Sequence, residues 1–600
     1  MLFLLRYCYQ ILYRYRLFVI LVFVSAIAFA CGTPQVESPK ENVILTAPLL
    51  SEPFLQSPTD NSVRVVWFTE FPGSENVVNW GNNFTQTSAA NTTKLTHIRE
   101  DQQSRVGKQT KDGQIYQQPV TRDIWRHEAE VTGLEKGKEI PYKVKSVKKD
   151  GSVAISEPYS LSTLPPAGKP LKILLTSDHQ LKSMVAANLQ KAKETLGDID
   201  AVFIAGDLIN IPDRGSEWFD DNRGGAFFKC LQGKANYKIK HNDTETVYTG
   251  APIIQNAPLY TAIGNHEVMG RRGKADSLGG EFNDPIPREV AKKLYGEELL
   301  NDDFFNSDTY EEIFSLPQSS EGGEKYYATS FGNIRLVVLY ATNIWRTPSL
   351  KDDSKGKYRE PSTEYENPEN WGYGQHIFEP INPDSKQYQW LTKELNSNEF
   401  KQAKYKVVML HHPLHSLGDN IVPAYTDPQQ IIERDANNKI TSVRYEYPKD
   451  ADYLIRDLEP LLTKAGVNLV YYGHSHIWNR FQNQEGVNFL ESSNVGNTYG
   501  AYVGDKQRPT PDTSSNKSSD KYKKEYVKTG DPNGLEAIVP TISPLTDENN
   551  KSLPYITSKE ITVFSMLDTA TGTVNSYRFD TRQPASKVVK FDEFKLISDS

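Results

Sequence analysis

The chain has 600 residues, more than one compact domain normally contains, so we expect at least two domains. Hydrophobic residues make up 38% and charged residues 24% of the chain, a composition that excludes global disorder. The 68 Lys and Arg against 76 Asp and Glu give a net charge of -8, which argues against a nucleic acid as a binding partner. Only 3 Cys exclude a disulfide framework and a cysteine-rich zinc module.

The first 30 residues have the layout of an export signal. Residues 1–16 contain Arg6, Arg14 and Arg16 but no acid, and residues 17–30 are apolar. At about 1.5 Å per residue the apolar run spans roughly 21 Å, short of the roughly 30 Å hydrocarbon core of a bilayer. A basic start and a short apolar run are typical of a signal peptide, which we predict over 1–30. An uncleaved membrane anchor that extends back through residues 1–16 is the alternative.

The end of this signal, Ala28-Phe29-Ala30-Cys31, resembles a bacterial lipobox, although Ala28 stands where Leu is usual. The resemblance implies that Cys31 is acylated and becomes the first mature residue. The protein would then be an exported, periplasmic or cell-surface lipoprotein anchored to the membrane by its N-terminus. We expect the polar residues 31–42 to form a tether.

From residue 43 to residue 163 the sequence alternates short β-rich segments with turn residues. Examples are 62–69, 76–81, 127–132 and 141–146. Strands at this spacing, without a helical period, predict an all-β antiparallel sandwich. No residue in this region suggests a functional site, so we interpret it as a structural module.

The Pro-rich segment 164–170 marks a domain boundary, after which the pattern changes. Helix-like stretches such as 183–196 and 385–395 now alternate with apolar runs typical of buried strands. The apolar runs are 171–176, 201–205, 259–263, 334–340, 407–410 and 467–472. This alternation predicts an α/β domain over 171–585, with a closing hairpin at 561–579. Polar insertions interrupt it at about 268–325, 343–384 and 501–552.

Residues suited to metal binding follow five of these predicted strands. They are Ser177-Asp178-His179-Gln180, Gly206-Asp207, Gly264-Asn265-His266-Glu267, His411 and Gly473-His474-Ser475-His476. Open α/β sheets bind their ligands at the carboxyl ends of strands, so we expect these side chains to converge. Carboxylates, an amide oxygen and imidazoles suit Zn, Mn or Fe(II), and one Asp carboxylate can bridge two ions. A lone histidine is more often structural, but five such strand ends are hard to explain in that way.

This ordered set resembles the motifs of the calcineurin-like metallophosphoesterases: D-x-[HG], G-D, G-N-H-[DE], a strand-end His and G-H-x-H. The similarity is greatest to purple-acid-phosphatase-like members with an N-terminal fibronectin-III-like domain, which residues 43–163 would supply. The resemblance implies an α/β fold, a layered β-sandwich flanked by helices, after an all-β fibronectin-III or immunoglobulin-like sandwich.

The resemblance also implies a role for each motif residue. Two divalent or trivalent ions (Fe, Zn or Mn) would be bound by Asp178, Gln180 and His476 at one ion, by Asn265, His411 and His474 at the other, and by Asp207 bridging both. His266 would be catalytic, steadying the phosphoryl oxygens or protonating the leaving group. A hydroxide on the two ions, which lie roughly 3.5–4 Å apart in such sites, would attack phosphorus in line.

Two positions depart from the family pattern, and both concern the first ion. Gln180 stands where most members have a ligating His. Asn210 stands three residues after Asp207, where the purple enzymes have a ligating Tyr. Whether Gln180, His179 or Asn210 ligates stays open; we favour Gln180 over His179, which could substitute only if the turn is rearranged. The resemblance therefore implies neither a purple chromophore nor a fixed iron requirement. We expect His412 to line the mouth of the site or to pack beside the ligand.

The sequence thus predicts an exported, acid-phosphatase-like metallophosphoesterase that acts on phosphomonoesters. A phosphodiesterase or nucleotidase remains open, because the motifs are shared and the rim of the site selects the substrate. An inert surface-binding protein with a phosphoesterase-like domain is the alternative of another class, and Gln180, Asn210 and the β-sandwich favour it. The natural substrate, the metal and the oligomeric state do not follow from the sequence.

Overall fold

The computed structural model describes residues 46–107, 109, 113–270, 277–296, 306–347, 355–509 and 526–597, which all belong to one compact unit of the chain. The predicted signal peptide, the tether and Cys31 lie outside these residues, as does the polar segment 510–525. Within the described ranges, no helix is long and apolar enough to cross a membrane.

The N-terminal β-domain consists of two antiparallel sheets around one apolar core. The first sheet has the order β1 (Phe54–Gln56), β2 (Ser62–Thr69), β8 (Trp125–Thr132) and β5 (Asn91–Lys94). The second has the order β10 (Val153–Ile155), β9 (Ile140–Val147), β3 (Glu75–Trp80) and β4 (Gln86–Ala89), with β11 (Tyr159–Leu161) also on β9. Trp67 lies in the core, and its indole N–H donates to Ser146 Oγ at 2.9 Å. All four segments predicted as strands here are strands.

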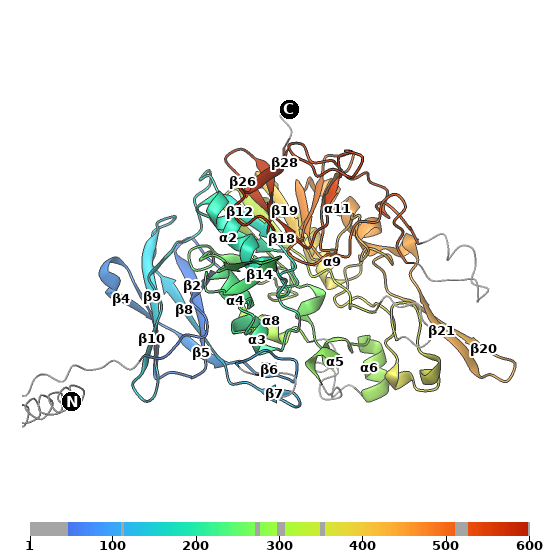
Figure 1. The fold of residues 1–600 in the computed structure, drawn as a ribbon, viewed down its shortest axis with the longest axis horizontal. Helices are drawn as coiled ribbons and strands as arrows, with labels where there is room; N and C mark the ends of the chain where they lie inside the picture. Colours follow the sequence, from blue (N-terminus) through green and yellow to red (C-terminus); the bar gives the residue numbers. More distant parts are fainter. Residues whose placement is uncertain are drawn as a thin grey trace, which may run out of the picture. The chain divides into compact units, whose positions relative to one another are not determined.

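Two larger sheets form the α/β domain (Figure 1). One has the order β16 (Leu259–Thr261), β13 (Ala201–Ile204), β12 (Lys172–Thr176), β26 (Ile561–Asp568), β27 (Thr573–Asp580) and β28 (Val589–Lys595). The other has the order β17 (Tyr327–Phe331), β18 (Ile334–Val338), β19 (Tyr405–Met409), β22 (Leu469–Tyr472), β24 (Asn488–Ser492), β23 (Trp478–Gln482) and β25 (Tyr555–Ile556). Strands β12, β13 and β16 are mutually parallel, as are β18, β19, β22 and β24.

Alternation along β19 shows how these layers pack. Val407 and Met409 belong to the same core as Ile173 and Phe203 of the other sheet. Val408 points to the opposite face and belongs to a second core. Successive side chains of a strand face opposite sides. One face of the sheet that contains β19 therefore packs on the sheet that contains β12, and the other face is covered by helices.

Helices cover the outer faces of these sheets. The main ones are α2 (Val185–Leu196), in the first core, and α9 (Lys386–Leu395) and α11 (Glu459–Ala465), in the second; a π-helical turn at Leu454–Leu458 precedes α11. The start of α9 is capped by Ser385 Oγ, which accepts from the Tyr388 N–H at 3.1 Å. The shorter helices are α3 (Gly215–Phe219), α4 (Phe227–Leu231), α5 (Leu278–Phe282), α6 (Arg288–Tyr295), α8 (Asp308–Ile313) and α10 (Asn398–Gln402).

Several features differ from the expectation or add to it. The six-stranded sheet that contains β12 continues to Lys595 through β28, ten residues beyond the predicted domain end at 585. The insertion at 268–325 is partly helical, since α5, α6 and α8 lie in it. Three hairpins were not predicted, because their short, half-polar strands add little to any core: β6 (Arg99–Glu100) with β7 (Val120–Thr121), β14 (Tyr237–His241) with β15 (Thr244–Tyr248), and β20 (Gln429–Arg434) with β21 (Ile440–Glu446).

Candidate metal centre

The predicted ligands lie on tight turns after the parallel strands. Five of them have positive φ angles, between 40° and 83°: Asp178, Gln180, Asp207, His474 and His476. A non-glycine residue in this region costs about 1 kcal/mol or more, and such strain gathers at functional sites. The turns are tied to one another, because the Asp178 N–H donates to Gly206 O and the Gln180 N–H donates to Leu208 O, both at 3.1 Å.

The motif glycines let the carboxylates approach these turns. A Cβ on Gly264 would lie 2.2 Å from Asp207 Oδ1, and one on Gly473 would lie 2.2 Å from Asp178 Oδ2. Both separations are far below van der Waals contact, so any side chain at these positions would displace a carboxylate. Gly264 and Gly473, the glycines of the third and fifth motifs, are therefore needed for space around the site.

The Asp207 carboxylate lies at the centre of the cluster and contacts three of the predicted site residues. It is 2% exposed, and its Oδ2 accepts from Gln180 Nε2 at 2.6 Å and lies 3.2 Å from His411 Nε2. Its Oδ1 accepts from the His266 N–H at 3.0 Å. Burial raises the pKa of this carboxyl, but the neighbouring His411 and His266 outweigh it and lower the pKa overall. Donor atoms of Asp178, Asp207 and His411 lie close enough together to share one ion.

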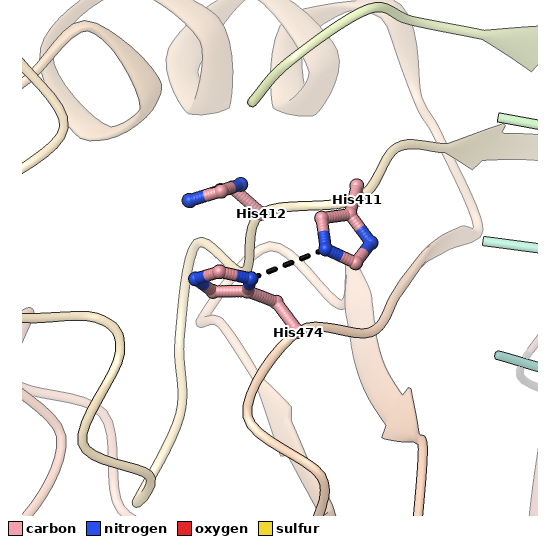
Figure 2. A group of neighbouring side chains, drawn as sticks. All are labelled: His411, His412 and His474. Atoms are coloured by element: carbon pink, nitrogen blue, oxygen red, sulfur yellow. Dashed lines mark hydrogen bonds between the residues drawn. The ribbon is translucent and has the colours of Figure 1, made fainter. Parts of the chain in front are cut away.

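Three histidines form a second group beside Asp207 (Figure 2). His411 donates from Nδ1 to Ala205 O at 2.7 Å, which leaves Nε2 facing His474 Nδ1 at 3.1 Å. The rings of His412 and His474 lie 3.7 Å apart between centroids with their planes tilted by 30°, and neither of the buried nitrogens of His412 has a hydrogen-bond partner. Of the two positions expected for His412, the structure therefore shows the second, beside the predicted ligand His474.

Asp178 and His476 form the other side of the cluster. The Asp178 carboxylate accepts from the His474 N–H at 3.0 Å and lies 3.3 Å from His476 Nε2. The His476 ring stacks on Tyr499, which is 42% exposed, with 5.0 Å between centroids. Burial and the nearby Asp207 and Asp178 raise the pKa of Tyr499 to about 12, so this ring remains a neutral phenol beside the site.

The residues present fit divalent ions. Among the described residues, three buried donor atoms of the predicted ligands have no hydrogen-bond partner: Gln180 Oε1, Asn265 Oδ1 and His476 Nδ1. Leaving a buried polar atom unpaired costs about 1–3 kcal/mol, and a cation coordinated there would remove that cost. Oxygen and imidazole donors are also the ligands that Zn, Mn and Fe(II) accept.

The alternatives for the first ion are placed differently. His179 hydrogen-bonds through Nε2 to Thr176 Oγ1 at 3.0 Å, and its ring lies 6.1 Å from that of Phe227. Burial lowers the pKa of His179 to about 4. Asn210 accepts from His266 Nδ1 through its backbone carbonyl at 2.7 Å. Of the three residues left open by the sequence, only Gln180 touches Asp207 with its side chain.

His266 stands at the edge of the cluster and is only partly buried. Its ring stacks on Phe282 of α5 with 4.7 Å between centroids. Because Nδ1 donates to Asn210 O, Nε2 is the ring nitrogen left for a substrate.

Two buried glutamates hold the ligand-bearing turns. Glu267 accepts from the N–H groups of Asp207 at 2.9 Å, Leu208 at 2.7 Å and Gly264 at 2.7 Å. Glu491 accepts from the Ser475 N–H at 2.8 Å, between the two histidines of the last motif. Burial raises the pKa of each carboxyl to about 8. Glu491 was missed by the sequence reasoning, because it lies in an ordinary buried strand, β24.

Comparison with known proteins defines the class. A sequence model described as calcineurin-like phosphoesterase matches residues 171–478, about half of the chain. The protein is therefore a phosphoesterase hydrolase, and the chain belongs to the calcineurin-like phosphoesterase family. A search among curated proteins finds no match.

Among the solved structures compared, a purple acid phosphatase shows a related fold. The purple acid phosphatase PPD1 from yellow lupin (Lupinus luteus) seeds is similar with a TM-score of 0.50 and 16% identity, over 92% of this chain and 74% of that chain. GAP50, the anchor in the inner membrane complex of Plasmodium, has a TM-score of 0.29 and 12% identity, over 71% of this chain and 90% of that chain. The family and the purple acid phosphatase fold imply divalent metal ions, for which the cluster around Asp207 offers a site.

Proposed function

We propose that this protein is an exported, acid-phosphatase-like enzyme that hydrolyses phosphomonoesters at a centre for two metal ions. The observation that carries the proposal is the position of Asp207. Its carboxylate touches Gln180 on one side and His411 on the other, so one residue joins both groups of donors.

The ligand assignment follows from this position. Asp178, Gln180 and His476 would hold one ion, Asn265, His411 and His474 the other, and Asp207 would join them. Bound ions would supply positive charge to the phosphate oxygens and acidify a water molecule. His266 remains outside both sets, and its Nε2 would hydrogen-bond to a phosphoryl oxygen or protonate the departing alkoxide.

Two lysines support a dianionic monoester over a monoanionic diester. Lys357 is 4% exposed, and the one hydrogen bond of its ammonium within the described residues is a weak one, to Val422 O at 3.4 Å. Burial lowers the pKa of Lys357 against the pull of Asp419. Lys182 forms no ion pair within the described ranges, although Asp178 and Asp207 act on its charge. The charge of Lys357 acts on His412 and His474, so we infer that both cations balance the second negative charge of a monoester.

The remaining parts of the proposal concern the N-terminal half of the chain. We assign residues 43–163 as a fibronectin-III-like domain, residues 1–30 as the export signal, and Cys31 as the acylated anchor residue. The paired antiparallel sheets around Trp67 support the first assignment, and the residue pattern before Cys31 supports the others. Labelling of cells with a fatty-acid analogue tests the anchor: the full chain takes up label and Cys31→Ser does not.

Metal content and turnover together test the activity. We expect close to two ions per chain after loading with Mn, Zn or Fe, and metal-dependent hydrolysis of p-nitrophenyl phosphate that exceeds hydrolysis of the bis-ester. Asn265→Ala and His266→Ala should each lose most of this activity, while Asn437→Ala, in an exposed hairpin turn, should keep it.

Other outcomes identify the competing functions. Preferred hydrolysis of the bis-ester would indicate a phosphodiesterase. No bound metal and no turnover of either ester would favour an inert binding protein and reject the proposal.

A further inference from the structure

One short segment of the N-terminal β-domain is built into the α/β domain. This interface loop, residues 99–104, consists of β6 and the turn after it. Arg99 forms a parallel β-bridge with Arg214, and its N–H donates to Asp213 O at 2.8 Å. Just before the loop, Ile98 is fully buried in the core that contains β12 and β13. The interface loop is therefore fixed to the segment that follows the Asp207 motif.

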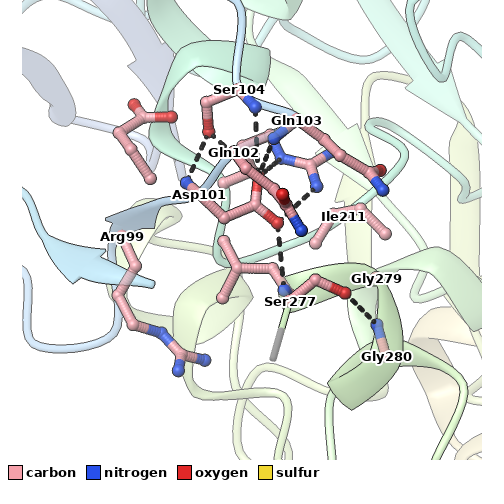
Figure 3. Close-up of polar contacts among 12 residues, drawn as sticks. Arg99, Asp101, Gln102, Gln103, Ser104, Ile211, Ser277, Gly279 and Gly280 are labelled. Carbon is pink, nitrogen blue, oxygen red and sulfur yellow. Dashed lines mark hydrogen bonds and ion pairs between the residues drawn. The ribbon is translucent and has the colours of Figure 1, made fainter. Parts of the chain in front are cut away.

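Side chains of the interface loop hold helix α5. Arg99 pairs with Glu281 of α5 at 2.7 Å and with Asp213 at 2.6 Å. The Asp101 carboxylate accepts from the N–H of Leu278, the first residue of α5, at 3.0 Å (Figure 3). The charged side chains in these contacts are no more than 9% exposed. Removing one partner of a buried ion pair leaves an uncompensated charge, so these contacts resist any displacement of α5.

Helix α5 in turn covers one face of His266. Phe282, its last residue, stacks on the His266 ring with 4.7 Å between centroids and 25° between planes. Phe282 is the neighbour of Glu281 along the chain, and it packs with Leu278 in a small apolar cluster. The two residues through which the interface loop holds α5 therefore also fix the ring of Phe282.

A second series of contacts leads from the interface loop to the edge of the same imidazole. The Asp101 carboxylate accepts from Arg214 at 3.1 Å, and Arg214 donates to Glu217 at 2.7 Å. Glu217 accepts from the Asn210 N–H at 2.7 Å. The Asn210 carbonyl then accepts from His266 Nδ1 at 2.7 Å. This series fixes the rotation of the ring and leaves Nε2 for a substrate.

Both series of contacts begin in the interface loop and end on His266. We propose that the interface loop positions this imidazole, so that the N-terminal β-domain takes part in the reaction and is not a structural module alone. The proposal rests on the proposed function, in which Nε2 of His266 meets the substrate. His266 needs this support because it is only partly buried and is not among the predicted metal ligands. A displacement of about 1 Å in such a site can lower the rate by up to about 100-fold.

A double-mutant cycle with Asp101→Asn tests the proposal in the metal-loaded full chain. Asn keeps the shape of Asp101, but its amide nitrogen would face N–H donors in either orientation. We expect kcat for p-nitrophenyl phosphate to fall about tenfold, with the metal content unchanged. In the His266→Ala background the same substitution should change kcat by less than about twofold, because a residue that acts through His266 has nothing left to position.

Glu128→Gln is the matched control. Glu128 also lies in the N-terminal β-domain, pairs with Arg126 and accepts from Ser315 Oγ of the α/β domain. Its substitution removes the same charge from another contact between the two domains, so kcat should stay within about twofold. Arg99→Lys is a milder second variant, which keeps the positive charge beside Glu281 and provides the test if Asp101→Asn does not fold.

Nitrogen NMR of the histidine-labelled chain gives a readout that does not depend on turnover. The signals of His266 are identified by their loss in His266→Ala. In the wild type we expect the proton on Nδ1, where Asn210 O accepts it. In Asp101→Asn and Arg99→Lys the signals should move towards an average of the two tautomers, whereas Glu128→Gln should leave them in place.

The outcomes separate this proposal from the function on which it rests. If the wild type hydrolyses no ester, the proposed function is rejected, and the NMR signals alone decide whether the interface loop holds His266. Equal losses of kcat in the wild-type and His266→Ala backgrounds would show a merely structural role and overturn the proposal. Unchanged His266 signals in both interface-loop variants would overturn it as well.

Discussion

The two sides of the candidate metal centre are built from different donors and are held in different ways. The His411 side offers two imidazoles and the Asn265 amide, whereas the Asp178 side offers one imidazole and two oxygen donors. The loop after His411 is anchored by a buried ion pair, in which His415 Nδ1 lies 2.8 Å from Asp531 Oδ2. The turn after Asp178 is anchored by backbone hydrogen bonds. Each side has one neutral amide, Asn265 or Gln180, so the two sides differ by one imidazole against one carboxylate. Gln180 stands where most of the family has an imidazole, which is a stronger ligand for Zn than a neutral amide oxygen, so we expect the Asp178 side to bind its ion more weakly than the family pattern would.

We expect the largest effect from replacing Asp207, the residue that both sides share. Asp207→Asn keeps the shape of the side chain but loses the negative charge between Gln180 and His411. We expect both ions to be lost on dialysis and kcat to fall about a thousandfold or more, because metal ions supply several kcal/mol of charge stabilisation. Metal analysis of the dialysed protein and steady-state kinetics measure the two effects.

Asp592→Asn is the matched control for this variant. Asp592 of β28 is also buried, but it pairs with Arg480 of β23 at 2.6 Å, away from the centre. This substitution should lower the free energy of unfolding and leave the metal content unchanged. Retention of both ions by Asp207→Asn would contradict the shared role of Asp207.

We expect a smaller effect on metal binding from substitutions that change only the Asp178 side. Gln180→His supplies the imidazole that most of the family has at this position, so we expect the more weakly held ion to bind about tenfold more tightly. Gln180→Ala should weaken the same ion by a similar factor, within the range of about 10–100-fold typical of residues that tune a metal site. Titration with a chelator, with metal content followed at each step, measures both. If Gln180→His leaves the affinity for the more weakly held ion unchanged, Gln180 does not bind that ion.

The contrast between the two sides also shows what the sequence could predict. The strands and the turns after them were predictable, because apolar runs end at motif residues with a fixed order along the chain. The place of Glu491 was not, since its role depends on burial beneath the turn that carries His474 and His476. The contacts of Arg99 and Asp101 with α5 were not predictable either. They join residues more than 170 positions apart, and no periodicity in either segment signals the pairing.

We expect the smallest effect, on stability, from the ion pair between His415 and Asp531, which anchors the loop after His411. Burial lowers the pKa of His415, but Asp531 and Glu459 outweigh it and raise the pKa from its ordinary value of 6.5 to about 9. A folded-state pKa above the unfolded value means that the stabilisation is fully present below pH 6.5 and is lost as the pH rises towards 9. We expect His415→Gln to lower the free energy of unfolding by roughly 2–3 kcal/mol at pH 6 relative to its effect at pH 9.5.

Denaturant unfolding of the wild type and His415→Gln at several pH values measures this difference. Subtracting the two curves removes the titration of the metal ligands, which both proteins share. The charged groups that face His415 are Asp531 and Glu459 of α11, so Asp531→Asn should reduce the same pH-dependent contribution. A gap between wild type and His415→Gln that stays constant from pH 6 to 9.5 would mean that His415 is neutral in the folded protein. In that case the loop after His411, like the turn after Asp178, would be held without a charge.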